Sequence, residues 1–556
     1  MTGPTALLTF GIGPVHELIS AARRVADVWA GSDLLSHLMG AAIEKARAVG
    51  GAPVFPAVDS RQELAGIPNR VVLRVPRDRA DRVAEAMRQA VEEEWTRLAG
   101  EAVEILRTYK IEPSDAIWPP TPSPARPRQT DRVFDIAWSW VAEDGDYAEA
   151  SRRGARRYAA SRLFRPFEQM VQTGEKCALC GSRTALPNGA RGDVRQAWEA
   201  AEEEAEKASD KGDQRFFRYD QGRLCLVCAT KRLYTRSGDK KVYFQALDRF
   251  DRAEESQSEE SAGARGEERR YVAVVAMDGD RMSEILAFGS EKVAGSVESF
   301  HRAVSSALGS FARSLRRSSA RDPLAHAQLD LDALGLRPRG PIRNRPQLLY
   351  AGGDDVLVVC APADALQVAR GIRERFLAEV QSLREHLKHP EDLDRLTLSG
   401  AIVYAHSKFP AGLLFLEAHD LLKRKAKGEA GRNALAIRLM KRSGVPVEVA
   451  FQWDGAPEGV AAGSWLRATD ELVERLQVGS LSSTQTFNLR REEEVLLDVF
   501  GEDTARWIPW LEDRLSRGEA TSAEAADLAQ RIAPYFVHRK TEALRIVRFL
   551  GVEVKA

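Results

Sequence analysis

The first 110 residues alternate between short apolar runs and apolar side chains at helical spacing. Residues 5–10 and 71–75 are nearly continuous apolar runs, and such runs predict buried strands. Helical spacing follows each run, first in a helix that begins near Val15 and then in a charged helix from about 79 to 106. The Gly-Ile-Gly-Pro turn at 11–14 is a strand-to-helix break or, alternatively, a phosphate contact. We expect this region to form an α+β unit.

A second alternating region begins at residue 271 and has the order strand, helix, strand, strand, helix, strand. This order is the ferredoxin-like arrangement. In that sheet the first strand lies antiparallel beside the third. The pattern predicts strands at 271–277, 347–351, 356–361 and 396–404, and helices near 291–316 and 363–387.

The turn between the second and third of these strands carries Gly352, Gly353, Asp354 and Asp355. The end of the first strand meets this turn in a ferredoxin-like sheet, which places Asp278 opposite the acidic pair. Clustered carboxylates suit Mg²⁺, a hard cation that shares its oxygen ligands with substrate phosphates. Two metals held in this way can activate a hydroxyl group and stabilise a leaving pyrophosphate. We therefore expect a catalytic metal site, although an ordinary solvated turn has the same composition.

Basic residues gather after a helix predicted at 412–427, next to a strand predicted at 434–440. They can hold a triphosphate, or they can form a solvated helix end, where cations favour the helix dipole. The His419-Asp420 dipeptide lies inside that helix without a companion His or Asp at suitable spacing, so we expect it to be structural. The basic cluster comprises Lys423, Lys425, Lys427, Arg432 and Lys441.

Four of the five cysteines form two CxxC pairs, Cys177 with Cys180 and Cys225 with Cys228. Each pair offers two thiolates, and two pairs complete a tetrahedral Zn²⁺ site. Four sulfur ligands leave no open coordination position, so we expect the zinc to be structural. The 44 residues between the pairs include a charged helix predicted at about 194–211.

Two stretches of unusual composition divide the chain. Residues 112–128 hold six prolines, and residues 253–269 almost lack large apolar side chains, so both read as linkers or extended loops. The last 90 residues show only helical periodicity, in helices expected at 465–476, 492–500, 504–515, 522–532 and 541–550. The predicted units are 1–110 (first α+β unit, without an acidic turn), 111–265 (helical, zinc-binding), 266–455 (with the acidic turn) and 456–556 (helical).

The composition of the 556 residues mainly indicates which properties the chain lacks. Lys and Arg together number 81, as do Asp and Glu, so no overall charge attracts the chain to nucleic acid. No apolar run is long enough to predict a membrane span, and no signal peptide is evident at the N-terminus. Paired CxxC motifs rather than a disulfide framework favour a reducing, cytoplasmic location.

Taken in order, these motifs resemble the large subunit of type III CRISPR effector complexes, in particular the Cmr (type III-B) form. The resemblance covers nearly the whole chain. Its motifs are specific when taken together, and each one alone would be weak. Its elements are residues 10–15, 27–32 and 68–70, the two CxxC pairs, and residues 277–280, 352–355, 432–434 and 441–444.

The resemblance implies an α+β protein with two ferredoxin-like palm domains, a zinc-binding helical domain and a C-terminal helical domain. It implies a nucleotidyltransferase that makes cyclic oligoadenylate from ATP when the complex binds target RNA. Its partners would be other Cmr-type subunits, guide RNA and target RNA. Asp278, Asp354 and Asp355 would be catalytic and hold Mg²⁺ or Mn²⁺, and the nucleotide would meet Gly352, Gly353, Gly279, Lys427 and Arg432. The number of residues between the phosphate-binding lysine and Gly431-Arg432-Asn433 does not decide between Lys427 and Lys425, so Lys425 stays an alternative.

Many members of this family begin with an HD nuclease domain. Here the first predicted strand starts within ten residues of Met1, and His419-Asp420 is misplaced for such a domain. We therefore expect no HD nuclease activity. Two other functions stay open at this point, adenylation of S-adenosylmethionine at the same site and a catalytically silent scaffold.

Overall fold

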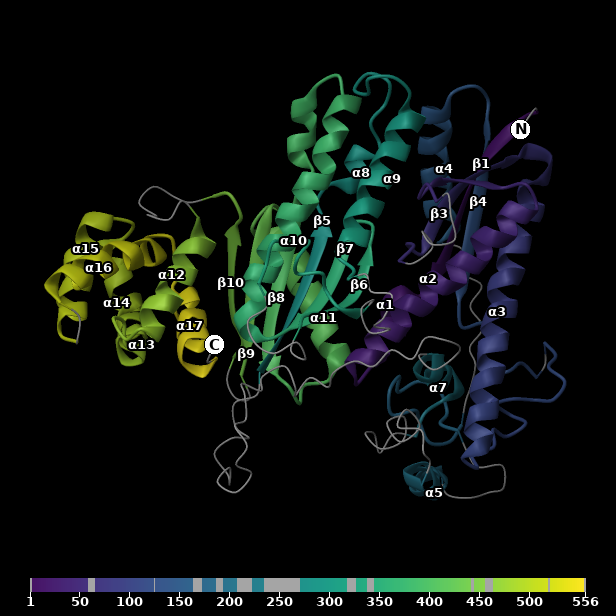
Figure 1. Cartoon of the computed structure of the whole chain (residues 1–556), viewed down its shortest axis with the longest axis horizontal. Coiled ribbons are helices and arrows are strands. Elements are labelled where there is room, and N and C mark those ends of the chain that lie inside the picture. The colour runs from purple at the N-terminus through teal and green to yellow at the C-terminus, as the bar shows by residue number, and fades with distance from the viewer. Residues whose placement is uncertain are drawn as a thin grey trace.

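The computed structural model shows two β-sheets side by side, a small cysteine-rich region beside the first, and a group of helices beyond the second (Figure 1). Among the described residues, no helix has both the length and the apolar character needed to cross a membrane. The predicted linker at 253–269 lies outside the described residues. The structure describes residues 3–58, 66–124, 126–163, 173–186, 194–207, 223–234, 271–317, 327–337, 345–441, 445–455, 464–518 and 521–554.

The first sheet has four antiparallel strands in the order β2-β3-β1-β4. Central β1 pairs with β3 on one side and with β4 on the other, so the first unit includes a strand that follows the proline-rich stretch. We expected this unit to end near residue 110. The structure differs because β1 has a second edge, and β4 satisfies its backbone groups there. The strands are β1 (Thr5–Gly13), β2 (Ala52–Phe55), β3 (Arg70–Pro76) and β4 (Asp135–Glu143); the helices are α1 (Val15–Ser20), α2 (Val25–Ala48), α3 (Ala80–Thr108) and α4 (Tyr147–Ser161).

The second sheet has six strands in the order β10-β9-β8-β5-β7-β6. Its first strand β5 lies antiparallel to both β7 and β8, as the ferredoxin-like pattern predicts. Strand β9 extends the sheet by pairing parallel to β8, and β10 pairs antiparallel to β9. The strands are β5 (Tyr271–Gly279), β6 (Gln347–Gly352), β7 (Asp355–Cys360), β8 (Leu398–His406), β9 (Ala434–Met440) and β10 (Val447–Gln452).

The helices of the second unit are shorter than the sequence pattern suggests. The helix expected from 291 begins at Val297, because the Ser296 side chain accepts a hydrogen bond from Ser299 N and caps it. The helix expected over 363–387 ends at Val380 and continues as a 3₁₀ turn. These helices are α8 (Met282–Ile285), α9 (Val297–Ser314), α10 (Ala365–Val380) and α11 (Ala411–Leu421), the last continuing as a π-helix over Leu422–Glu429.

Both faces of the second sheet are covered. On one face, Ala273 and Val275 of β5 belong to a core shared with α9, α10 and the C-terminal helices. On the other, Val272 and Val274 belong to a core shared with α11 and with α2 of the first unit. Alternate β5 side chains therefore face two different cores, as the period of a strand requires. The two sheets are joined through the second of these cores.

The remaining helices lie at the two ends of the molecule (Figure 1). In the cysteine-rich region, α7 packs against α2 and α3. At the opposite end, α12 and α17 pack on β10. One of the C-terminal helices, α13, was not predicted. The helices are α5 (Val194–Lys207), α7 (Leu226–Leu233), α12 (Trp465–Gln477), α13 (Ser483–Arg491), α14 (Glu493–Phe500), α15 (Thr504–Ser516), α16 (Ser522–Val537) and α17 (Glu542–Arg548), the last followed by a π-helical turn at Phe549–Glu553.

Candidate active site and zinc centre

The end of β5 meets the turn between β6 and β7, which confirms the juxtaposition predicted from the strand order. Met277 pairs with Val356, one residue beyond the turn. A Cβ atom on Gly279 would lie 2.5 Å from Asp354 Oδ2, so the Asp354 side chain packs directly on the end of β5. Any larger residue at position 279 would displace that carboxylate. The glycine after Asp278 is thus part of the geometry that brings the acidic residues together.

A lysine from a distant part of the sequence lies among these groups. Lys427 Nζ donates to Asp278 Oδ2 at 2.7 Å and to the carbonyl oxygen of Gly279 at 2.7 Å. Its Nζ is 3.7 Å from Asp280 Oδ1. The π-helix that follows α11 carries Lys427 to this position. Of the two lysines that the sequence left open, Lys427 reaches the acidic residues, whereas Lys425 pairs with Glu429 at 2.6 Å.

The acidic pair of the turn is held in an unfavourable electrostatic environment. Withdrawal from water, followed by repulsion from Asp278, raises the pKa of Asp354 to about 6. The same two causes raise the pKa of Asp355 well above its usual value. Crowded carboxylates of this kind gain most from a bound cation. Among the described residues, only the cysteine cluster has three or more His, Cys, Asp or Glu ligand atoms that all lie within 4.8 Å of one another. The carboxylates of this site are therefore spaced more widely than that.

Asp280, which the sequence analysis did not select, is the most enclosed carboxylate of the site. Its side chain is 0% exposed. Thr397 Oγ1 donates to Asp280 Oδ2 at 2.7 Å, and Ser399 Oγ lies 2.8 Å from the same oxygen. The backbone N–H of Asn433 donates to it at 3.0 Å. The Asp-Gly-Asp sequence at 278–280 was a signal that could have identified this residue.

A cavity of about 590 Å³ opens beside the turn, between the two units. Gly352, Gly353 and Asp354 line one side of it. The first unit contributes Asn69 and Arg70 at the start of β3. Helix α9 contributes Arg302 and Arg313, so the charged side chains that line the cavity, Asp354 apart, are cationic. The contribution of the first unit was not predicted, because nothing local in the sequence pairs those residues with the turn.

Two partly buried side chains support the backbone of the turn. Tyr350 Oη donates to the carbonyl oxygen of Gly352 at 3.4 Å, and Arg316 donates to the carbonyl oxygen of Ala351 at 3.0 Å. Burial raises the pKa of Tyr350, which therefore stays a neutral hydroxyl. Burial lowers the pKa of Arg316, and the nearby Asp33 opposes that effect. The backbone leading into the acidic turn is thus fixed by side chains that sequence reasoning missed.

The other members of the basic cluster lie around the site rather than in it. Arg432 is exposed and has a φ of 74°, next to Asn433 with a φ of 47°. Lys423 is exposed, and its charge weakly lowers the pKa of Asp355. Lys441 is exposed at the end of β9, and the motif residues 442–444 lie outside the described residues. Only Lys427 of the five makes a described direct contact with the acidic groups.

His419 and Asp420 make packing and ion-pair contacts within and beside α11. Asp420 Oδ2 lies 3.1 Å from Arg438. The ring of His419 packs on Phe415 with a centroid distance of 4.3 Å, and burial lowers the pKa of His419 to about 4. The neutral imidazole fits this apolar contact.

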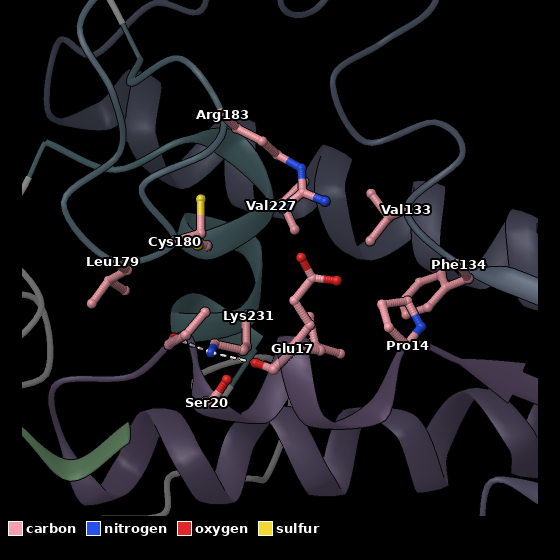
Figure 2. Close-up of a pocket in the computed structure, with 13 residues that line it drawn as sticks. Pro14, Glu17, Ser20, Val133, Phe134, Leu179, Cys180, Arg183, Val227 and Lys231 are labelled. Carbon is pink, nitrogen blue, oxygen red and sulfur yellow. Dashed lines mark hydrogen bonds between the residues drawn. The ribbon is translucent and has the colours of Figure 1, made fainter. Parts of the chain in front are cut away.

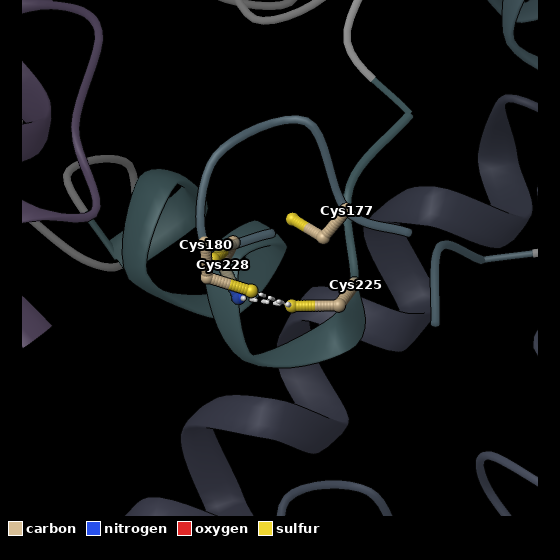
Figure 3. A group of neighbouring side chains, drawn as sticks. All are labelled: Cys177, Cys180, Cys225 and Cys228. Atoms are coloured by element: carbon tan, nitrogen blue, oxygen red, sulfur yellow. Dashed lines mark hydrogen bonds between the residues drawn. The ribbon is translucent and has the colours of Figure 1, made fainter. Parts of the chain in front are cut away.

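The four cysteines predicted to bind zinc lie together at the start of α7 (Figure 3). Their sulfur atoms are all within 4.8 Å of one another, and Cys180 Sγ is 3.8 Å from Cys225 Sγ. A tetrahedron with Zn–S bonds of about 2.3 Å requires nearly that separation. Backbone N–H groups of Leu179 and Cys228 donate to Cys177 and Cys225 at 3.4 Å, which favours thiolates. The donor set fits a structural zinc ion, with no position open for catalysis.

Helix α7 is tied to the first unit by buried charges. Arg232 and Asp27 form a two-point ion pair with a closest distance of 2.7 Å, and both side chains are almost fully buried. Burial opposes ionisation of Asp27, but Arg232 outweighs it and lowers the pKa of Asp27. Lys231, also buried, donates to the carbonyl oxygens of Leu18 and Ala21. Lys231 lines a small cavity of about 150 Å³ beside the cysteines (Figure 2).

Comparisons with known proteins agree with this architecture. Residues 271–436 match the model of the second palm domain of Cas10/Cmr2. Residues 7–100 match the model of the N-terminal region of the CRISPR-associated protein Cmr2. The Cmr2 subunit of the CRISPR system Cmr of Pyrococcus furiosus is 30% identical over 178 residues, which are 32% of this chain and 19% of that protein. The match thus spans less than a fifth of that relative's length.

Solved structures show the same fold over most of the chain. A chain in the cryo-EM structure of the apo type III-B Cmr-beta complex has a TM-score of 0.58 and 13% identity. The alignment covers 93% of this chain and 78% of that one. The Cmr-beta complex bound to cognate target RNA gives a TM-score of 0.55 and 13% identity, covering 93% and 79%. In order along the chain, the N-terminal region and the second palm domain thus both match family models of Cmr2 or Cas10/Cmr2 proteins.

Proposed function

We propose that this chain is a nucleotidyltransferase that makes cyclic oligoadenylate from ATP when its effector complex binds target RNA. One observation carries the proposal. Asp354 and Asp355, on the β6–β7 turn, meet the end of β5 at Asp278, where Lys427 also lies. The turn lines a cavity whose charged side chains, Asp354 apart, are all arginines, which suits a triphosphate.

The residues present fit a divalent cation. The raised pKa values of Asp354 and Asp355 show two carboxyl groups that are costly to ionise without a counter-charge. Together with Asp278 they would hold Mg²⁺ or Mn²⁺. When bound, such a cation neutralises phosphate charge and favours the attacking hydroxylate.

The chain's own groups would bind and orient the nucleotide. Lys427 is placed to exchange its contact with Asp278 for a phosphate oxygen, and exposed Arg432 lies on the adjoining loop. Gly352 and Gly353 line the cavity, and at Gly353 a Cβ atom would meet nothing within 4 Å, so the backbone is open there. Together with Gly279, these residues make up the predicted nucleotide contacts. In the reaction, a ribose hydroxyl attacks an α-phosphate and pyrophosphate leaves.

We place the chain in a cytoplasmic Cmr-type complex with other Cmr subunits, a guide RNA and a target RNA. A fold relative is part of a complex bound to cognate target RNA, which supports this assignment. None of the described cysteines forms a disulfide, and four of them make up the cluster assigned to zinc.

The test is to incubate the assembled complex with target RNA and radiolabelled ATP, and to identify the products by mass spectrometry. Asp354→Ala combined with Asp355→Ala should abolish the product while the complex still assembles. Asp470→Ala is the matched control, because Asp470 is a half-buried carboxylate that pairs with Arg370 on helix α10. Unchanged conversion by the double variant would refute the assignment. No conversion by the wild type would favour a scaffold, and an adduct with S-adenosylmethionine would change the acceptor.

A further inference from the structure

The loop after the π-helix has an unusual backbone. Gly431, Arg432 and Asn433 have successive φ values of 79°, 74° and 47°. Arg432 and Asn433 are not glycines, and residues with a side chain seldom adopt this left-handed backbone region. Other contacts must therefore hold the loop in place. This loop joins Lys427 to β9 and presents Arg432.

Asp280 supplies the contact on the side of the loop that faces β5. Its Oδ2 accepts the Asn433 N–H at 3.0 Å, and it is fixed in turn by Thr397 and Ser399 at the start of β8. Its Oδ1 lies 3.7 Å from Lys427 Nζ. One buried carboxylate therefore touches β8, the loop and the lysine.

The opposite side of the loop is held by different residues. Asn433 Nδ2 donates to Asp454 at 3.0 Å, and Arg373 donates to Asn433 Oδ1 at 3.1 Å. Trp453 N donates to the carbonyl oxygen of Asn433 at 2.9 Å. These contacts fix Asn433 but do not reach Lys427. The backbone N–H of Arg432 also donates to the carbonyl oxygen of Ala426 in the π-helix at 3.1 Å, but Asp280 is the side chain described as contacting both the loop and Lys427.

We propose that Asp280 is a positioning residue, which sets the Arg432–Asn433 loop and Lys427 to receive the phosphates of the nucleotide. This inference rests on the proposed function, because it names how the phosphate-binding groups of that site are held. A carboxylate is required here, since the Asn433 N–H can only donate and Lys427 is a cation. An asparagine would turn a donor towards one of them or lose the charge that attracts Lys427.

The experiment compares wild type with Asp280→Asn in the full chain, using α,β-methylene ATP, which cannot release pyrophosphate. Equilibrium dialysis with Mg²⁺ should show binding weakened about tenfold or more, a loss expected for one charged hydrogen bond. Hydrogen exchange should become faster in peptides that cover residues 430–434, with exchange in β10 unchanged. Asp470→Asn, the same chemical change at a half-buried ion pair on α12, should alter neither measurement.

The outcomes separate this inference from the proposed function. Wild type that fails to bind the analogue would contradict the proposed function. Wild type that binds, together with Asp280→Asn binding equally well, would overturn the positioning role. If Asp280→Asn does not fold, Thr397→Val keeps the shape of the side chain and removes one donor to Asp280. It should weaken binding in the same direction by a smaller factor, and unchanged binding and exchange in Thr397→Val would also overturn the inference.

Discussion

Lys427 and Asp278 are in direct contact, with 2.7 Å between Nζ and Oδ2, although 148 residues separate them along the chain. The lysine side chain is 16% exposed and that of Asp278 is 38% exposed, so the pair lies at the wall of the site rather than beneath it. The charge of the same ammonium opposes the rise in the pKa values of Asp354 and Asp355. A single cation therefore offsets part of the repulsion among three carboxylates.

Replacing Lys427 by methionine should weaken ATP binding and raise the pH that activity requires. The KM for ATP should rise about 10- to 100-fold, as expected for one charged hydrogen bond. Loss of the ammonium leaves Asp354 and Asp355 harder to ionise, so the acidic limb of the pH–activity profile should move to higher pH. Steady-state kinetics across pH 5.5 to 8.5 would measure both effects.

The matched control is Lys425→Met on the same π-helix, because Lys425 pairs with Glu429 instead of the acidic site. It should leave the KM and the pH profile close to those of wild type. A larger effect from Lys425→Met than from Lys427→Met would reverse the assignment of the phosphate-binding lysine.

Asp354 should make the metal-free protein less stable as the pH rises. Its folded-state pKa of about 6 lies above the ordinary aspartate pKa of 3.8, so between these values the folded state binds more protons than the unfolded state. Stability therefore falls as pH increases through this window. Asp354→Asn should match wild type near pH 4 and have a higher Tm above pH 7 in EDTA.

Added Mg²⁺ should raise the Tm of wild type above pH 7 and so narrow its difference from Asp354→Asn. Calorimetry or dye-based melting at several pH values would measure this. An equal Tm difference at every pH would show that Asp354 is not the group responsible.

Gly279→Ala should abolish most activity while leaving the fold intact. The new methyl group would lie 2.5 Å from Asp354 Oδ2, and the carboxylate must move to relieve the overlap. A displacement of about 1 Å in a catalytic group costs roughly 100-fold in rate. Product formation should therefore fall by about that factor, with a small change in Tm.

Gly100→Ala provides the comparison for this glycine substitution. Gly100 lies within α3, and a Cβ atom there meets nothing within 4 Å. Activity should be unchanged, and alanine in a helix should slightly raise the Tm. Full activity of Gly279→Ala would show that Asp354 need not keep its present position.

The cysteine cluster should hold one zinc ion per chain and stabilise the region around α7. Cys225→Ser removes one of four ligands and should lower both the zinc content and the Tm. Cys360→Ala is the control, because Cys360 is buried in β7, away from the cluster. It should keep the zinc, as measured by elemental analysis. Full zinc content in Cys225→Ser would refute four-cysteine ligation.

The sequence predicted the strand order of the second unit because strong apolar runs flank turns of clear composition. The prediction that Asp278 lies beside the acidic turn followed from the strand order alone. The same reasoning missed β2, β4 and β10, although β10 has apolar side chains at 447, 449 and 451, the alternation of a half-buried strand. It also overran helix ends, since Ser296 caps α9 through a side-chain contact that periodicity does not reveal.

Residues that complete the site through tertiary contacts were harder to find. Arg316 and Tyr350 act on the backbone of the turn, and Asn69 and Arg70 reach the cavity from the other unit. No spacing rule links such positions to the turn. Asp280 is different, because it stands two residues from Asp278 in a sequence already noted for its acids. The local motif was visible, but the burial of Asp280 and its three hydrogen-bond donors were not.

The shared core between the two sheets limits how this protein can be divided. Val272, Val274 and Ala276 of β5 pack in the same core as α2, and the amide of Gly412 donates to the carbonyl oxygen of Ala22. Gly412 lies so close to this segment that a Cβ atom would overlap the carbonyl oxygen of Ser20. A fragment beginning at residue 271 would leave part of its central strand bare and apolar, and exposed surfaces of that kind promote aggregation. The fragment should therefore be insoluble when expressed alone, and its solubility should recover when residues 3–234 are supplied as a separate chain.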